Sequence, residues 1–174
     1  MKILIGYDGS KSADAAIATA GKLLAGFHRE AIVLTVWEPV VVGALHAARF
    51  GAPMAAVAAD ASGIDDDSEQ RARKLAEHGA RLAYDSGFDA TPLWAADERD
   101  VPSAIVDEAT KFDVDLVVLG ARGLAGVRAF LGSVSNHVLQ HSHRPVLVIP
   151  ASSEGEPNPE PPADVVRSTD SARG

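Results

Sequence analysis

Apolar residues along this chain follow two patterns that alternate from the first residue to about residue 150. Short runs rich in β-branched residues are typical of buried strands, and longer segments with an apolar residue every three or four positions are typical of helices. Because the strands alternate with helices and are apolar on both faces, we expect an α/β fold with a parallel sheet covered on both sides. The predicted strands are residues 1–6, 31–36, 89–95, 115–119 and 145–149.

Turn and capping residues indicate where the predicted helices begin. Asp8-Gly9-Ser10 is typical of a tight turn that ends in the N-cap of a helix. Asp66 and Glu69 have the spacing of a capping box, which predicts that the next helix begins there. Pro102 fits the first turn of a third helix, and a fourth is expected to begin near Gly132-Ser133.

Residues 38–65 are expected to form a lid-like loop within a domain that covers residues 1–150. Residues 40–59 are nearly all apolar and about long enough to cross a bilayer. However, His46, Arg49 and Pro53 interrupt the run, and alanine and glycine outnumber leucine and isoleucine in it. We therefore interpret this segment as a surface loop or short helical lid and not as a membrane span.

Composition narrows the class of protein. The chain has 174 residues, 47% of them hydrophobic and 23% charged, as expected for a soluble globular domain. Residues 151–174 are rich in proline and acidic residues, and we expect this tail to be disordered. A net charge of −8 argues against a nucleic-acid partner, and the absence of cysteine excludes disulfides and thiolate chemistry. No signal-peptide pattern is visible, so a cytoplasmic location is expected.

The richest candidate for chemistry is the stretch GARGLAGVRAFLGS at residues 120–133. It follows the apolar run 116–119 and leads into a predicted helix. Glycines let a bulky phosphate approach the backbone, and N–H groups at the start of a helix attract anions. This arrangement predicts a phosphate-bearing ligand, and a nucleotide is the interpretation we favour.

Other chemistries have little support in the sequence. There is no P-loop pattern, no nucleophile elbow and no evident nucleophile–base pair, so we expect at most slow ATP hydrolysis. His137, His141 and His143 lie close together in sequence, but no nearby carboxylate or cysteine completes a set of metal ligands. Asp8 also has an ordinary interpretation, because Asp-Gly-Ser is a common turn at the start of a helix.

The turn at Tyr7-Asp8-Gly9-Ser10, the glycine stretch and the closing run at residues 144–148 together resemble the universal stress protein A family over residues 1–150. The resemblance implies a Rossmann-like, five-stranded parallel sheet in the order 3-2-1-4-5. It also implies binding of ATP or a related adenine nucleotide, with Mg²⁺ as an optional companion of a triphosphate. A homodimer through the last strand, Val146–Ile149, is expected on the same ground.

The resemblance also assigns parts of the ligand to residues. Asp8 would meet the ribose or adenine, and Tyr7 and Val36 would wall the adenine. Phosphates would lie against the main chain and hydroxyl groups of the glycine stretch, with a charge from arginine. The residues assigned to phosphate are Gly120, Arg122, Gly123, Gly132, Ser133 and Val134.

The glycine stretch departs from the family's nucleotide-binding pattern at one point. Gly123 and Gly132 are separated by eight residues, one fewer than the pattern G-x2-G-x9-G-[S/T] requires. Two alternatives therefore stay open beside nucleotide-dependent regulation in stress response. One is a stress scaffold that binds no nucleotide and acts through its dimer surface and lid. The other is a slow ATPase.

Overall fold

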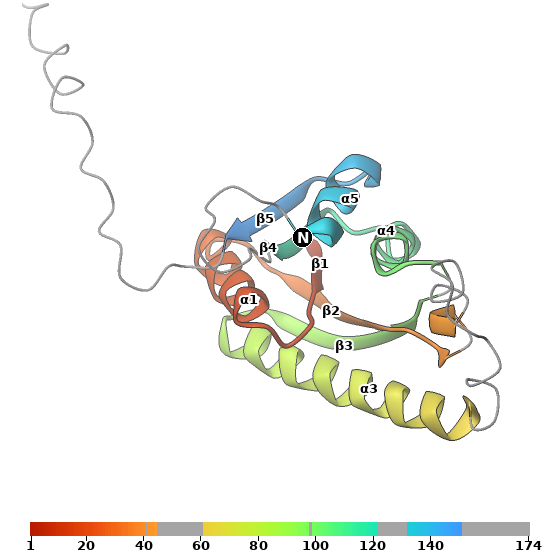
Figure 1. Ribbon diagram of the computed structural model, residues 1–174. Helices are drawn as coiled ribbons and strands as arrows, with labels where there is room; N and C mark the ends of the chain where they lie inside the picture. Colours follow the sequence, from red (N-terminus) through yellow and green to blue (C-terminus); the bar gives the residue numbers. More distant parts are fainter. Residues whose placement is uncertain (41, 45–60, 98, 122–131, 151–174) are drawn as a thin grey trace, which may run out of the picture.

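The computed structural model describes residues 1–40, 42–44, 61–97, 99–121 and 132–150 (Figure 1). Five strands form one parallel sheet in the order β3-β2-β1-β4-β5, which confirms the predicted architecture and strand order. The expected tail at residues 151–174 lies outside the described residues. The strands are β1 Lys2–Gly6, β2 Glu30–Trp37, β3 Asp89–Ala96, β4 Leu116–Ala121 and β5 Val146–Pro150.

Helices cover both faces of the sheet. On one face α1 (Lys11–Leu23) and α3 (Ala61–Asp85) lie side by side, and on the other α4 (Val101–Lys111) packs beside α5 (Ser133–His141) (Figure 1). The helix starts predicted from Ser10, Pro102 and Gly132 are confirmed within one residue.

The start of α3 differs from the prediction. The helix begins at Ala61 and not at Asp66, so the capping-box interpretation is wrong and residues 61–65 are helical. The acidic side chains have tertiary partners instead. Asp65 accepts a hydrogen bond from the Val40 N–H at 2.7 Å, and Glu69 accepts one from Trp94 Nε1 at 3.1 Å. These two carboxylates therefore bind other parts of the chain.

Two apolar layers hold the sheet between its helices. Along β1, Ile3 and Ile5 face α1 and α3, whereas Leu4 faces α4 and α5. All three are fully buried, and burying such a side chain stabilises the fold by roughly 1.5–3 kcal/mol. Because both faces are covered, the strand is apolar at successive positions, which is the pattern seen in the sequence.

The strand order reverses beside β1. The chain leaves β1 toward β2 on one side, and it later returns to place β4 on the other side. Connections that diverge in this way leave a crevice at the carboxyl ends of the two strands, where ligands of doubly wound sheets bind. The residues that follow β1 and β4 therefore lie where a ligand of this fold class is expected.

Candidate functional site

A cavity of about 290 Å³ opens at this crevice. It lies between the carboxyl ends of β1, β2 and β4 and the first turns of α1, α4 and α5. Its size is close to the lower end of the range for small-molecule sites. The lining residues are Gly6, Tyr7, Asp8, Ser10, Ala13, Leu34, Val36, Val101, Ile105, Leu119, Gly120, Gly132, Ser133, Val134 and Ser135.

One end of the cavity is apolar. Val36 lies there as the resemblance implies, together with lining residues that the sequence analysis did not single out. Val101 and Ile105 come from the sheet-facing side of α4, and all of these residues belong to or pack against one core layer. Such a wall suits a flat, weakly polar ring. The additional wall residues are Leu34, Val101, Ile105 and Leu119.

Tyr7 lines the cavity and is almost fully buried. The ring is buried in the α1/α3 layer, where its hydroxyl donates a hydrogen bond to Asp14 Oδ1 at 2.8 Å. Burial, with help from Asp14, raises the pKa of the Tyr7 hydroxyl. Side chains alternate along β1, so the Tyr7 side chain belongs to the opposite core layer from Val36, and the expectation that Tyr7 walls an adenine stays a prediction.

Asp8 lies at the rim of the cavity and is exposed. Its Oδ1 accepts a hydrogen bond from the Ser10 N–H at 2.9 Å, and Ser10 Oγ in turn accepts one from the Ala13 N–H at 3.2 Å. The turn-and-cap interpretation of Asp8-Gly9-Ser10 is therefore confirmed. It is compatible with a ligand contact, because the same turn brings the Asp8 carboxylate to the mouth of the cavity.

The start of α5 forms the other end of the cavity. Gly132 is the N-cap residue, and among the described residues no side chain caps this end of the helix. Ser133 is exposed and Val134 lines the cavity beside it. The first N–H groups of a helix lack partners within the helix and carry partial positive charge. The end of α5 is thus suited to receive an anion.

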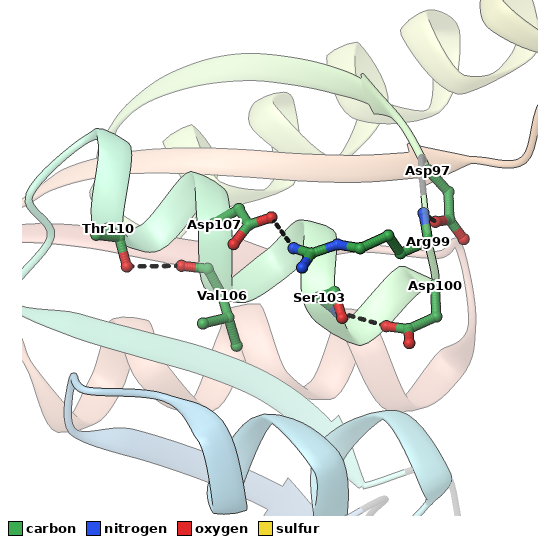
Figure 2. Close-up of polar contacts among 7 residues, drawn as sticks. All are labelled: Asp97, Arg99, Asp100, Ser103, Val106, Asp107 and Thr110. Atoms are coloured by element: carbon green, nitrogen blue, oxygen red, sulfur yellow. Dashed lines mark hydrogen bonds and ion pairs between the residues drawn. The ribbon is translucent and has the colours of Figure 1, made fainter.

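The start of α4, by contrast, is capped by a side chain (Figure 2). The Asp100 carboxylate accepts a hydrogen bond from the Ser103 N–H at 2.7 Å, and hydrogen bonds from Ser103 hold the pKa of Asp100 below its usual value. Arg99 pairs with Asp107 on the outer side of the same helix. With α1 capped by Ser10 and α4 by Asp100, the two neighbouring helix ends already hold an acceptor, unlike α5.

Gly120 lies where β4 passes the first turn of α1. A Cβ atom on Gly120 would come within 2.6 Å of Ser12 Oγ and 2.7 Å of the Ser12 carbonyl carbon and oxygen. Close packing against α1 therefore requires glycine here, whatever the ligand. The sequence analysis missed Ser12 and Ser135, whose hydroxyls donate to the Ala121 and Gly120 carbonyls at 2.8 and 3.1 Å.

Two of the residues assigned to phosphate lie outside the described part of the chain. Arg122 and Gly123, both assigned to phosphate, belong to the undescribed range 122–131. Within the described ranges, no group of three or more His, Cys, Asp or Glu side chains is placed to hold a metal ion. His137 and His141 instead stack, with ring centroids 4.1 Å apart. No helix in the described part of the chain has the length and hydropathy of a membrane span.

Two curated relatives share parts of this sequence. The universal stress protein Sll1388 of Synechocystis sp. is 52% identical over 46 residues, which are 26% of this chain and 30% of that protein. The universal stress protein YxiE of Bacillus subtilis is 32% identical over 87 residues, 49% of this chain and 57% of that protein. The matched region thus spans less than two thirds of the length of either relative.

Solved structures share the fold over most of the chain. The protein MJ0577 has a TM-score of 0.66 and 22% identity, covering 87% of this chain and 96% of its own. A universal stress protein in complex with cAMP has a TM-score of 0.61 and 23% identity, with coverage of 87% and 98%.

A plant structure extends this group. A universal stress protein family protein from Arabidopsis thaliana with AMP bound has a TM-score of 0.59 and 17% identity, covering 91% of this chain and 97% of its own. At these identities the likenesses show the fold alone.

The sequence profile described as the universal stress protein family matches residues 1–150, most of the chain. On that match, the chain belongs to the universal stress protein family.

Proposed function

We propose that this protein binds an adenine nucleotide in the cavity at the carboxyl ends of β1 and β4. The observation that carries the proposal is the pairing of an apolar wall with a helix end that no described side chain caps, in one cavity. A nucleotide has the matching halves, a flat base and a phosphate. Two relatives of the same fold were crystallised with AMP and with cAMP, which supports this class of ligand.

In this proposal the base lies against Val36 and its apolar neighbours. The ribose lies near Asp8 at the rim, within reach of the carboxylate as a hydrogen-bond acceptor. The first phosphate lies at the start of α5, where main-chain N–H groups and the Ser133 hydroxyl donate to it. Gly120 contributes to the site through packing, because the absence of a side chain lets β4 approach α1 closely.

We extend the proposal to ATP, with Mg²⁺ as a companion of the triphosphate. Arg122 and Gly123, which the sequence analysis assigned to phosphate, are our candidates for contacts with the β- and γ-phosphates. Arginine is well suited to phosphate oxygens because its fork of N–H donors makes charge-assisted hydrogen bonds. Mg²⁺ would be held mainly by phosphate oxygens and water. The biological role we propose is nucleotide-dependent regulation in stress response.

The test is isothermal titration calorimetry of the full chain with AMP, ATP, adenosine and inorganic phosphate, with and without Mg²⁺. We expect AMP and ATP to bind more tightly than adenosine, and free phosphate to bind weakly. Two substitutions of Asp8 distinguish the effect of its charge from the effect of its hydrogen bond to Ser10. Asp8→Ala removes the carboxylate, whereas Asp8→Asn keeps an acceptor for the Ser10 N–H. No binding of any nucleotide to the parent protein would disprove the proposal.

The short spacing between Gly123 and Gly132 favours one competing function, a stress scaffold that binds no nucleotide. In that case the protein would act through its surfaces, including the edge strand β5. We propose that a second copy of the chain pairs along Val146–Ile149 in either case. An intact dimer without any heat of nucleotide binding would favour the scaffold, and a dimer with nucleotide affinity that Asp8→Ala weakens would exclude it.

A further inference from the structure

We propose that Ser12 and Ser135 are positioning residues, which hold the carboxyl end of β4 between α1 and α5 and so direct the start of α5 toward the ligand's phosphate. The inference rests on the proposed function, because it assigns how the same site would recognise a phosphate. Neither serine needs to touch the ligand for this role.

Ser135 connects α5 to β4. It lies in the first turn of α5, is only 3% exposed, and its hydroxyl donates to the Gly120 carbonyl at 3.1 Å. Ser135 lines the cavity together with Ser133 and Val134 of the same turn. The hydrogen bond therefore fixes the position of the main-chain N–H groups that would meet a phosphate.

Ser12 connects α1 to the next residue of β4. It lies in the first turn of α1, is 8% exposed, and its hydroxyl donates to the Ala121 carbonyl at 2.8 Å. The contact leaves no space for a side chain on Gly120, whose Cβ would meet Ser12 at 2.6 Å. Ser12 and Gly120 therefore set the distance between β4 and α1.

The two hydrogen bonds act on a part of β4 that the sheet holds less firmly. The pairing of β4 with β1 runs from Leu116 to Val118, so the last residues of β4 pair with β5 but not with β1. Helices on opposite faces of the sheet supply the missing support, α1 through Ser12 and α5 through Ser135. Hydrogen bonds to a phosphate weaken steeply as their geometry departs from linear. A small displacement of α5 would therefore cost phosphate affinity first.

A positioning role and a purely structural role of these two hydroxyls predict different effects when the hydroxyl is removed. A hydroxyl that only stabilises the fold would, when removed, alter the free energy of unfolding but leave the ratio of affinities for AMP and adenosine unchanged. A hydroxyl that positions the start of α5 would alter that ratio, because adenosine carries no phosphate. The ratio is thus the measurement that distinguishes the two roles.

The experiment compares Ser135→Ala and Ser12→Ala with the parent chain by calorimetric titration with AMP and with adenosine. Ser142→Ala is the matched control, since Ser142 lies at the opposite end of α5 and its hydroxyl also donates to a main-chain carbonyl, that of Arg144, at 3.1 Å. We expect each of the first two variants to bind AMP about fivefold more weakly, the effect of one neutral hydrogen bond, and adenosine as the parent does. The control should bind both ligands normally.

Two results overturn the inference while leaving the proposed function intact. One is unchanged AMP affinity in both variants, and the other is an equal loss of affinity for AMP and adenosine. If the parent chain binds neither AMP nor ATP, the proposed function fails and the inference fails with it. Circular dichroism and thermal melting check that each variant is folded, and either serine variant alone supplies the comparison if the other does not fold.

Discussion

The side chain of Tyr7 leaves no room for a residue larger than glycine at position 79 of α3. A Cβ atom on Gly79 would come within 2.6 Å of Tyr7 Cδ1 and 2.9 Å of Val33 Cγ1. Glycine in the middle of a helix is unfavourable relative to alanine by about 1 kcal/mol. The close approach of α3 to the sheet therefore outweighs helix propensity at this position.

We expect Gly79→Ala to destabilise the protein by roughly 1–3 kcal/mol, because overpacking a filled core costs more than the gain in helix propensity. Gly26→Ala is the control, since a Cβ atom there would meet nothing within 4 Å. Urea unfolding monitored by circular dichroism measures both. A Gly79→Ala variant as stable as the parent would contradict the packing described for Tyr7.

The raised pKa of Tyr7 makes stability depend on pH in the alkaline range. The folded state keeps the Tyr7 proton above pH 10.0, the ordinary pKa of a tyrosine, whereas the unfolded chain releases it. The contribution of this group is therefore complete below pH 10.0 and is lost as the pH rises toward the folded-state value.

We expect the free energy of unfolding of the parent to fall more steeply above pH 10 than that of Tyr7→Phe, which has no proton to lose at this position. The Tyr84→Phe variant should follow the parent, because Tyr84 is 72% exposed. Guanidinium unfolding at a series of pH values between about 8 and 11 gives the slopes. Parallel slopes for the parent and Tyr7→Phe would contradict this account.

At the scale of elements, the strands follow from their composition alone, whereas one helix boundary does not. Parallel strands covered on both faces need apolar residues at successive positions, and few other local structures share this pattern. The first turns of α3 contain Asp65 and Glu69, whose carboxylates accept hydrogen bonds from Val40 and Trp94, and no local spacing reveals these partners. The start of α4 was predictable from Pro102, because proline is favoured in a first helical turn.

The cap of α4 gives a prediction in the acid range. Asp100→Ala should destabilise the protein by about 1 kcal/mol at neutral pH, and Asp100→Asn by less, because asparagine still accepts from the Ser103 N–H. The lowered pKa of Asp100 means that its contribution is present above the ordinary value of 3.8 and is lost as the pH falls through the folded-state value. Thermal melting at pH 7 and below pH 4 measures both effects. Equal melting of parent and Asp100→Ala at pH 7 would show that the cap contributes nothing.

At the scale of the whole molecule, the place of the site was predictable and its recognition groups were only partly so. Asp8 and the glycines near residues 120 and 132 meet at one cavity because the carboxyl ends of β1 and β4 are neighbours. The orientation of the Tyr7 ring was not deduced, although alternation along β1 contains that information. The partners of Ser12 and Ser135 were not predictable, since a serine in a sequence does not identify a carbonyl partner more than a dozen residues away.

The proposed dimer can be tested at the edge strand. Val148 belongs to β5 but to neither core layer, so a charge at this position should disfavour strand pairing between copies with little effect on the fold. We expect Val148→Lys to reduce the mass measured by light scattering from two chains to one. Leu139→Lys, at an apolar residue of α5 that is 44% exposed, should leave the mass unchanged. A parent protein that is already a single chain would disprove this mode of pairing.

The hydrogen bond of 2.7 Å between the Val40 N–H and Asp65 Oδ1 has a consequence for protein engineering. It holds the chain that follows β2 beside the second turn of α3, through a contact that does not involve residues 45–60. Doubling the length of such a joining peptide costs only about 0.6 kcal/mol of closure entropy. A reporter domain inserted between residues 44 and 61, ahead of α3, should therefore leave the sheet and its crevice folded.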